Sequence, residues 1–207
     1  MSLLTGLPYK DRLGNDIYPD FRNMLQIERI AENPNMDGIE KTIASLKMFY
    51  GDDIPGDTTA AFMELLWFYY RGEDMPKGRK KIVRLFDFDE DSPYIIAAFL
   101  SSYAVDLTNA DYHLHWWQFM NLFVALPDDT QMMKRMCDRN LDTSKMKGEQ
   151  RRYYEARKKA VALKGKRKPQ GETLQERREA RQRRLDELYA EAQRNRAKEG
   201  GDTNASS

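Results

Sequence analysis

The sequence has a single cysteine, only two histidines and no long uninterrupted run of apolar residues. Because Cys137 stands alone, it can form neither an intrachain disulfide nor a cysteine-based metal cluster, and a reducing compartment is expected. The histidines, His113 and His115, lie two residues apart and point to different sides of a helix, so no shared metal is expected. The densest apolar stretches, 62–70 and 116–126, are short and carry polar residues. No membrane span is therefore expected, nor does the start of the chain resemble a secretory signal.

Motifs for enzymatic chemistry are also missing. No G-x-S-x-G turn presents a serine, and the twelve glycines are scattered instead of forming a phosphate-binding loop. Asp87, Asp89 and Asp91 imitate the start of a calcium loop, but Ser92 stands where glycine is required and Ala98 where the bidentate glutamate belongs. Acids just before a helix are instead typical of favourable contact with the helix dipole. We expect no catalytic, cofactor or metal site, and a protein that is not an enzyme.

Charged and aromatic residues are distributed unevenly along the chain. Residues 1–142 hold 15 Lys and Arg against 23 Asp and Glu, a net charge of −8, whereas residues 143–199 hold 19 against 9, a net charge of +10. All three Trp, all nine Phe and eight of the eleven Tyr lie in the first segment. A segment so rich in apolar residues can bury a core, whereas the polar segment cannot. We predict a helical body over residues 1–142 and a basic extension over 143–207, which is partly helical and has a disordered end.

Apolar periodicity predicts an all-α fold for the body. A short extended segment with a turn at Gly14 and Asn15 precedes the first helix, which begins at an acidic N-cap, Asp20. The predicted helices cover residues 20–33, 36–50, 57–71, 93–105, 114–126 and 129–140. Those at 93–105 and 114–126 are apolar nearly all round, which favours a compact bundle with a central buried hairpin of two antiparallel helices.

Local composition also predicts how individual helices begin. Ser92, followed by a proline, is the expected N-cap of the helix at 93–105, and Asp128 or Asp129 is the expected N-cap of the last body helix at 129–140. In the basic extension, residues 145–163 and 172–198 can form helices. Glu155 is placed to pair with Lys158 or Lys159.

Two groups in the body are candidates for binding a partner. Trp116 and Trp117 are adjacent and diverge by about 100° on a helix, so they cannot both fill the same pocket, and one interpretation is that one packs in the core while the other faces a groove. A core position for both is the favoured alternative, because the neighbouring residues are apolar too. Met132, Met133 and Met136 share one helix face, which is more often core than a docking surface, although methionine adapts well to varied partners.

Arginines of the basic extension are the remaining candidates for partner binding. They are Arg151, Arg152, Arg177, Arg178, Arg183 and Arg184. With Tyr153 and Tyr154 available for stacking, such clusters suit nucleic acid. A solvated charged appendage is the favoured alternative, and nucleic acid is not the expected partner. A third interpretation is that the extension lies against the acidic body of the same or a neighbouring subunit.

Four segments carry a resemblance to a known family. The segments DFRNMLQIERIAE, IEKTIASLKMFYGDDIP, DFDEDSPYIIAAFLSSYAVDL and LHWWQFMNLFVALPDD, within residues 20–140, resemble the fifteenth gene product of siphophages of Gram-positive bacteria. Genes of this family lie between those for the major tail protein and the tape-measure protein. That position is typical of tail-assembly chaperones. The resemblance brings no catalytic residues with it.

The resemblance implies a chaperone that binds the tape-measure protein in the host bacterial cytoplasm and keeps it soluble. The helical body would self-associate as a homo-oligomer and hold the tape measure in apolar grooves, while the basic extension recruits an acidic partner such as the major tail protein. Two other functions remain open at this point. One is a nucleic-acid-binding phage accessory protein that acts through the basic extension, and the other is a structural component of the virion.

Overall fold

The computed structural model describes residues 6–73, 84–165, 179 and 182–183. Within these residues the secondary structure is helical, without a strand, and only two isolated bridges join Lys10 to Asp16 and Asp20 to His115. The helices are α1 (Phe21–Glu32), α2 (Gly38–Tyr50), α3 (Thr58–Tyr69), α4 (Ser92–Tyr103), α5 (Trp116–Val124), α6 (Gln131–Asn140) and α7 (Gly148–Ala160). The predicted all-α fold is confirmed.

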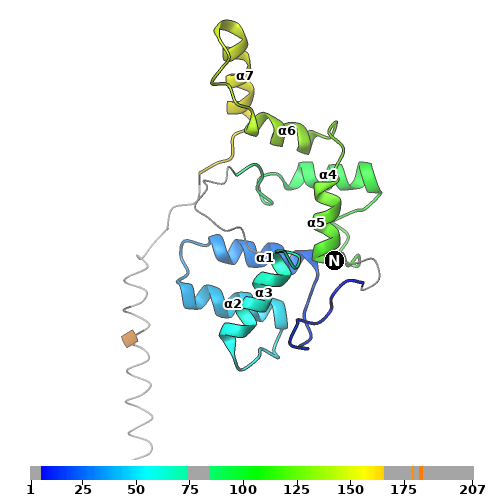
Figure 1. Ribbon diagram of the computed structural model, residues 1–207, viewed down its shortest axis with the longest axis vertical. Coiled ribbons are helices and arrows are strands. Elements are labelled where there is room, and N and C mark those ends of the chain that lie inside the picture. Colours follow the sequence, from blue (N-terminus) through cyan, green and yellow to red (C-terminus); the bar gives the residue numbers. More distant parts are fainter. Residues whose placement is uncertain (1–5, 74–83, 166–178, 180–181, 184–207) are drawn as a thin grey trace, which may run out of the picture.

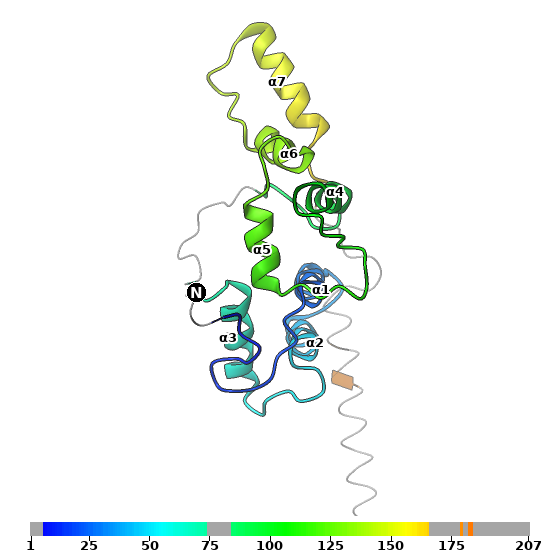
Figure 2. The same ribbon diagram turned by 90° about the vertical axis from the view of Figure 1, so that its right-hand side faces the viewer.

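Along the long axis of the described part, the group α1–α3 is followed by α5, α4, α6 and α7 (Figures 1 and 2). In both views α1 and α2 lie side by side near one end with α3 next to them, and α5 leads from this group towards α4. α6 packs on α4, and α7 lies beyond α6 at the opposite end. The molecule therefore has two regions, α1–α3 and α4, α6 and α7, with α5 between them.

The centre of the fold is an aromatic core around α5. Phe119 of α5 stacks on Phe21 of α1 and on Phe99 of α4, with ring centroids 4.8 and 5.1 Å apart. Both views show α4 lying across the end of α5 instead of alongside it. The expected antiparallel alignment of these two helices is therefore not found, because α5 divides its contacts between α1 and α4.

Aspartates cap the N-termini of the first three helices. The carboxylate of Asp20 accepts the backbone N–H of Arg22, which confirms the predicted start of α1. Asp37 begins α2 in a capping box with Glu40, and Asp57 caps α3. These bonds satisfy backbone donors that a helix leaves unpaired in its first turn.

The predicted starts of α4 and α6 are wrong in detail. Ser92 is the first residue of α4 and not its cap, and its hydroxyl donates to the carbonyl of Asp89 at 3.0 Å. Asp91 occupies the cap position but makes no capping bond, because its carboxylate binds arginines of α6. Thr130, not either preceding aspartate, caps α6 by accepting the N–H of Met133.

The segment before α1 is extended with a tight turn, as predicted. Gly14 in this turn has a φ of 94°, which few residues other than glycine adopt. The Oδ1 of Asp11 accepts the N–H of Asn15 at 2.8 Å, and its Oδ2 accepts the hydroxyl of Tyr50 in α2 at 2.9 Å. Burial would raise the pKa of Asp11, but these hydrogen bonds lower it overall. Asp11 thereby fastens the N-terminal turn to α2.

A buried ion cluster fastens α4 to α6. The side chain of Asp91 is fully buried and accepts Nη1 and Nη2 of Arg139 at 2.6 and 2.9 Å, and Nε of Arg135 at 3.2 Å. Arg139 also donates to the carbonyls of Leu85 at 2.8 Å and Val161 at 2.6 Å. Burial alone would raise the pKa of Asp91, but Arg139 and the other donors outweigh it and lower that pKa.

α7 lies in the basic extension and is tied to the body. Arg157 pairs with Asp138 of α6 at 2.7 Å, and Lys158 donates to the carbonyl of Leu141 at 2.8 Å. The body and the basic extension are therefore in contact, although the composition changes after residue 142. The predicted second helix of the extension, 172–198, lies almost wholly outside the described residues.

Candidate functional site

A partly open cleft of about 910 Å³ lies between α1, α2, α3 and the segment 84–88. We call it the α1–α3 cleft. Large apolar side chains from α3 and from the segment 84–88 make up much of its lining. They are Phe62, Leu65, Leu66, Tyr69, Tyr70, Leu85, Phe86 and Phe88. Such a surface suits the apolar face of a helix or a small molecule.

Smaller side chains on α1 and α2 leave room in this cleft. Ala31 of α1 and Gly38, Thr42 and Ser45 of α2 line it opposite bulkier groups. A Cβ added at Gly38 would meet no atom within 4 Å, so the space beside this residue is open. α1 and α2 pack side by side, and these small side chains form one wall of the cleft.

One carboxylate lies among the apolar lining. Glu28 of α1 is half-buried, and its Oε1 accepts a hydrogen bond from the hydroxyl of Tyr69 in α3. Burial raises the pKa of Glu28 to about 7, and the Tyr69 hydrogen bond opposes this only in part. Burial also raises the pKa of Tyr69, so its hydroxyl remains a donor. A glutamate that exchanges its proton near neutral pH is typical of functional sites.

The remaining charges of the cleft are concentrated near Glu28. Arg84 pairs with Glu32 at 3.1 Å and also with Asp87. Lys41 donates to a backbone carbonyl of α1 at 2.7 Å. Three acids therefore face two cations in the lining, and the cleft has a slight excess of negative charge when Glu28 is ionised.

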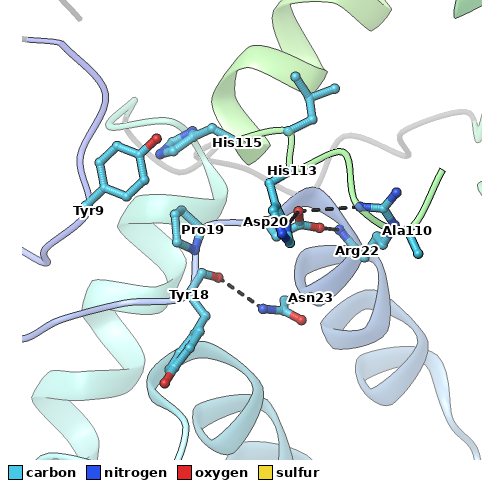
Figure 3. A pocket seen from close by; sticks show the side chains of 10 residues that line it. Tyr9, Tyr18, Pro19, Asp20, Arg22, Asn23, Ala110, His113 and His115 are labelled. Atoms are coloured by element: carbon cyan, nitrogen blue, oxygen red, sulfur yellow. Dashed lines mark hydrogen bonds and ion pairs between the residues drawn. The ribbon is translucent and has the colours of Figure 1, made fainter. Parts of the chain in front are cut away.

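A smaller pocket of about 430 Å³ lies where the loop before α5 meets the start of α1 (Figure 3). Figure 3 shows Asp20 between His113 and Arg22, with Tyr9 and Tyr18 on the other side of Pro19. Asp20 caps α1 and also lies 3.4 Å from Nδ1 of His113 and 3.5 Å from Arg22. None of the ten lining residues is a serine, threonine or cysteine.

The polar groups of this pocket hold two elements together. Arg22 donates to the carbonyls of Leu107, Asn109 and Tyr112 in the loop before α5, at distances between 2.7 and 3.1 Å. His115 caps α5, because its Nδ1 accepts the N–H of Trp117, and its Nε2 lies 2.9 Å from the carbonyl of Pro8. Burial lowers the pKa of His115, which keeps the imidazole neutral. We assign these residues to the fold.

The structure places both candidate tryptophans in the core. Trp116 and Trp117 are 1% and 5% exposed, and their indole N–H groups donate to the carbonyls of Tyr69 and Phe68 in α3. The favoured alternative, a core position for both, therefore holds, and neither of these two tryptophans faces a groove. Their role is to join α5 to α3, because a buried indole N–H needs an acceptor.

The methionine face of α6 is largely used in packing. Met132 is fully buried, whereas Met133 and Met136 are half-buried against the core. Cys137 on the same helix is exposed. None of the three methionines lines either of the two pockets described above.

The arginine candidates are only partly covered by the described residues. Arg151 and Arg152 are exposed on α7, and Arg151 pairs with Glu155 at 2.7 Å. Glu155 therefore pairs four residues towards the N-terminus and not with the predicted lysines. Arg183 is exposed, with its Nε 3.3 Å from the carbonyl of Glu179. The other candidates, Arg177, Arg178 and Arg184, lie outside the described residues.

Sequence reasoning did not identify Glu28, Tyr69 or Arg84. One signal was present in the helix itself, because Glu28 follows Phe21 and Met24 by seven and four residues and so occupies a position of the apolar stripe. An acid at such a position is expected to be partly buried. Its partner Tyr69 is 41 residues away, which no helical spacing reveals.

In the described ranges, no three His, Cys, Asp or Glu side chains are gathered in a way that would hold a metal ion. Nor does any described helix combine the length and apolar character needed to cross a membrane.

Comparison with known proteins identifies the family of the chain. The family model described as bacteriophage Gp15 protein matches residues 11–163, which reaches past the body and includes α7. No curated protein and no solved structure matches the chain. The matched range contains the whole lining of the α1–α3 cleft and the buried ion cluster, and all of the smaller pocket except Tyr9. Because the match covers most of its length, this chain belongs to the bacteriophage Gp15 protein family.

Proposed function

We propose that this protein is a tail-assembly chaperone that binds helical segments of the phage tape-measure protein and keeps them soluble in the host cytoplasm. The observation that supports the proposal is the α1–α3 cleft, which is partly open, apolar and bordered by charges. Membership of a phage family is consistent with a role in particle assembly. A long helical partner with apolar stripes suits a groove that buries one helix face at a time.

The basic extension has a second part in this proposal. Arg151 and Arg152 are exposed on α7, at the end of the molecule opposite the α1–α3 cleft. A partner held there would be kept away from the helix in the cleft. We assign this end to an acidic partner such as the major tail protein, with binding that weakens as salt is added.

Co-expression with the tape-measure protein tests the chaperone role. Ala31→Tyr would fill the cleft from an exposed position of α1, and Ala97→Tyr on the exposed face of α4 is the matched control. We expect the soluble fraction of the tape measure to rise with the wild-type chain and with Ala97→Tyr, but not with Ala31→Tyr. Circular dichroism checks that both variants are folded.

Each outcome of the co-expression has a distinct meaning. If the wild-type chain does not raise the solubility of the tape measure, the chaperone role is wrong. If Ala31→Tyr works as well as Ala97→Tyr, the chaperone role stands but the cleft is not the binding site.

A nucleic-acid-binding function is the second candidate, favoured by the exposed Tyr153 beside Arg151 and Arg152 on α7. Two arginines of this helix are already paired with acids, Arg151 with Glu155 and Arg157 with Asp138. Filter binding against salt concentration distinguishes the two functions, because phosphate neutralisation gives a steep log–log slope. A third candidate, a structural virion component, would be detected by mass spectrometry of purified particles.

A further inference from the structure

Glu28 has few partners for a carboxylate in its position. It is half-buried on α1 among the apolar residues of the α1–α3 cleft, and a single hydroxyl, that of Tyr69, donates to it. A carboxylate has about four acceptor positions. Among the residues that the structure describes, no ion pair to Glu28 is found.

The cations of the cleft are occupied elsewhere. Arg84, the cation that favours ionisation of Glu28, is bound between Glu32 and Asp87. Lys41 donates to a backbone carbonyl of α1. The acids Glu32 and Asp87 add repulsion at Glu28. A helix that covered Glu28 with apolar atoms alone would remove water from this carboxylate and supply nothing in return.

We propose that the α1–α3 cleft binds an amphipathic helix that carries a lysine or arginine within its apolar face, and that Glu28 selects this cation. The inference rests on the proposed function, since it names the kind of helix that the cleft accepts. An ammonium or guanidinium group would form a charge-assisted hydrogen bond with Glu28 in a partly desolvated site. The excess of acids in the cleft favours such a partner over one with a buried acid.

This arrangement predicts opposite pH dependences for two kinds of helix. A helix with the cation binds the ionised form of Glu28, so its affinity rises between pH 6 and pH 8. A helix with leucine at that position binds the protonated form, so its affinity falls over the same range. This follows because the pKa of Glu28, raised by burial to about 7, lies between the two pH values.

Two designed peptides test the inference with the full chain. They are amphipathic helices of about 18 residues that differ at one central position of the apolar face, which is lysine in one and leucine in the other. At pH 8, fluorescence anisotropy should give about tenfold tighter binding for the lysine peptide, the effect of one charge-assisted hydrogen bond. At pH 6 this preference should shrink or reverse.

Variants of the chain show whether Glu28 is responsible. Glu28→Gln should abolish the preference and its pH dependence while still binding the leucine peptide, and Glu32→Gln, one turn along α1, should leave the preference in place. Equal binding of both peptides at pH 8, an unchanged preference in Glu28→Gln, or no binding of either peptide would each overturn the inference. So would an oligomer that Ala31→Tyr dissociates, because a second copy would then occupy the cleft.

The co-expression experiment separates this inference from the proposed function. If Glu28→Gln keeps the tape-measure protein soluble as well as the wild type does, the chaperone role stands and the selection by Glu28 is wrong. If no version of the chain keeps the tape measure soluble, the chaperone role is wrong whatever the peptides show.

Discussion

Two buried or half-buried acids distinguish the two regions of this molecule. At the α4–α6 junction, Asp91 has no exposed side-chain surface and is bound by Arg139 and Arg135, and its pKa is lowered. In the α1–α3 cleft, Glu28 has one hydroxyl donor, and burial raises its pKa to about 7. Both sites desolvate a carboxylate, but only the first supplies a described cation in direct contact.

The difference shows how one chain can use the same functional group in two ways. At Asp91 the compensating charges come from the chain itself, so the acid is ionised and joins the start of α4 to α6, while Arg139 also joins α6 to the end of α7. At Glu28 the compensation comes from a proton, which a partner cation can replace. In the first region the chain's own arginines therefore satisfy the buried acid, whereas in the second region the ionisation of the acid depends on pH and on nearby charge.

The largest effect is expected from Arg139→Ala. This change leaves Asp91 buried with Arg135 as its cation, and it removes the donor from the carbonyls of Leu85 and Val161. Breaking a buried pair from one side costs about 3–5 kcal/mol, so the free energy of unfolding in urea should fall by about that amount. An effect below about 1 kcal/mol would show that the cluster does not hold the junction.

The same variant should also change the response to acid. The pKa of Asp91 is lower in the folded chain than in the unfolded chain, so its contribution to stability is present above about pH 4 and is lost as pH falls through the folded value. Without Arg139, the pKa of Asp91 in the folded chain should lie closer to its unfolded value. The variant should therefore lose less stability than the wild type when the pH falls. Urea unfolding at pH 3 and pH 6 measures the difference.

In the α1–α3 cleft, Glu28→Gln should have the opposite effect, because it should increase the stability of the chain. The pKa of Glu28 is raised in the folded chain, so its contribution is favourable at pH values below the unfolded pKa and is lost as pH rises through about 7. A glutamine carries no charge and keeps an acceptor for the Tyr69 hydroxyl. The variant should therefore be more stable than the wild type by about 2 kcal/mol at pH 8, and close to it at pH 5.

Glu32→Gln is the control for this prediction, because Glu32 is exposed and pairs with Arg84 at the rim. Thermal unfolding at the two pH values gives the comparison. If Glu28→Gln is no more stabilising at pH 8 than at pH 5, the carboxylate is not desolvated as described.

Local patterns predicted much of this fold and little of the candidate site. The apolar periodicity from Phe21 onwards and the N-cap at Asp20 located α1, because both signals act within one or two turns. Ser92 was the wrong cap for α4 because Asp91, which precedes it, is bound by Arg139, 48 residues along the chain. Contacts of that separation depend on how helices pack, which periodicity does not encode.

The candidate site also depends on contacts between residues that are far apart in the sequence. Trp116 and Trp117 diverge on their helix, which suggested that one of them could face a groove, but their indole N–H groups bind carbonyls of α3 and both are buried. The cleft arises only when α1, α2, α3 and the segment 84–88 come together. Glu28 had one sequence signal, as an acid on an apolar stripe, but that signal does not reveal the cleft.

Tyr69→Phe should give the smallest effect and isolates the single hydrogen bond to Glu28. The hydroxyl favours the ionised carboxylate, so removing it should raise the pKa of Glu28 above its present value of about 7. At pH 8 the loss of this hydrogen bond should cost about 1 kcal/mol of stability, and less at pH 5, where the carboxyl is protonated. The ring should still stack on Trp116, whose N–H binds the backbone carbonyl of residue 69 and not its hydroxyl.

Titration of ¹³C-labelled glutamate carboxyls by NMR measures the pKa directly, with Tyr70→Phe in the same cleft as the matched control. A pKa that moves equally in both variants would mean that the cleft in general, and not the Tyr69 hydroxyl, sets the ionisation of Glu28.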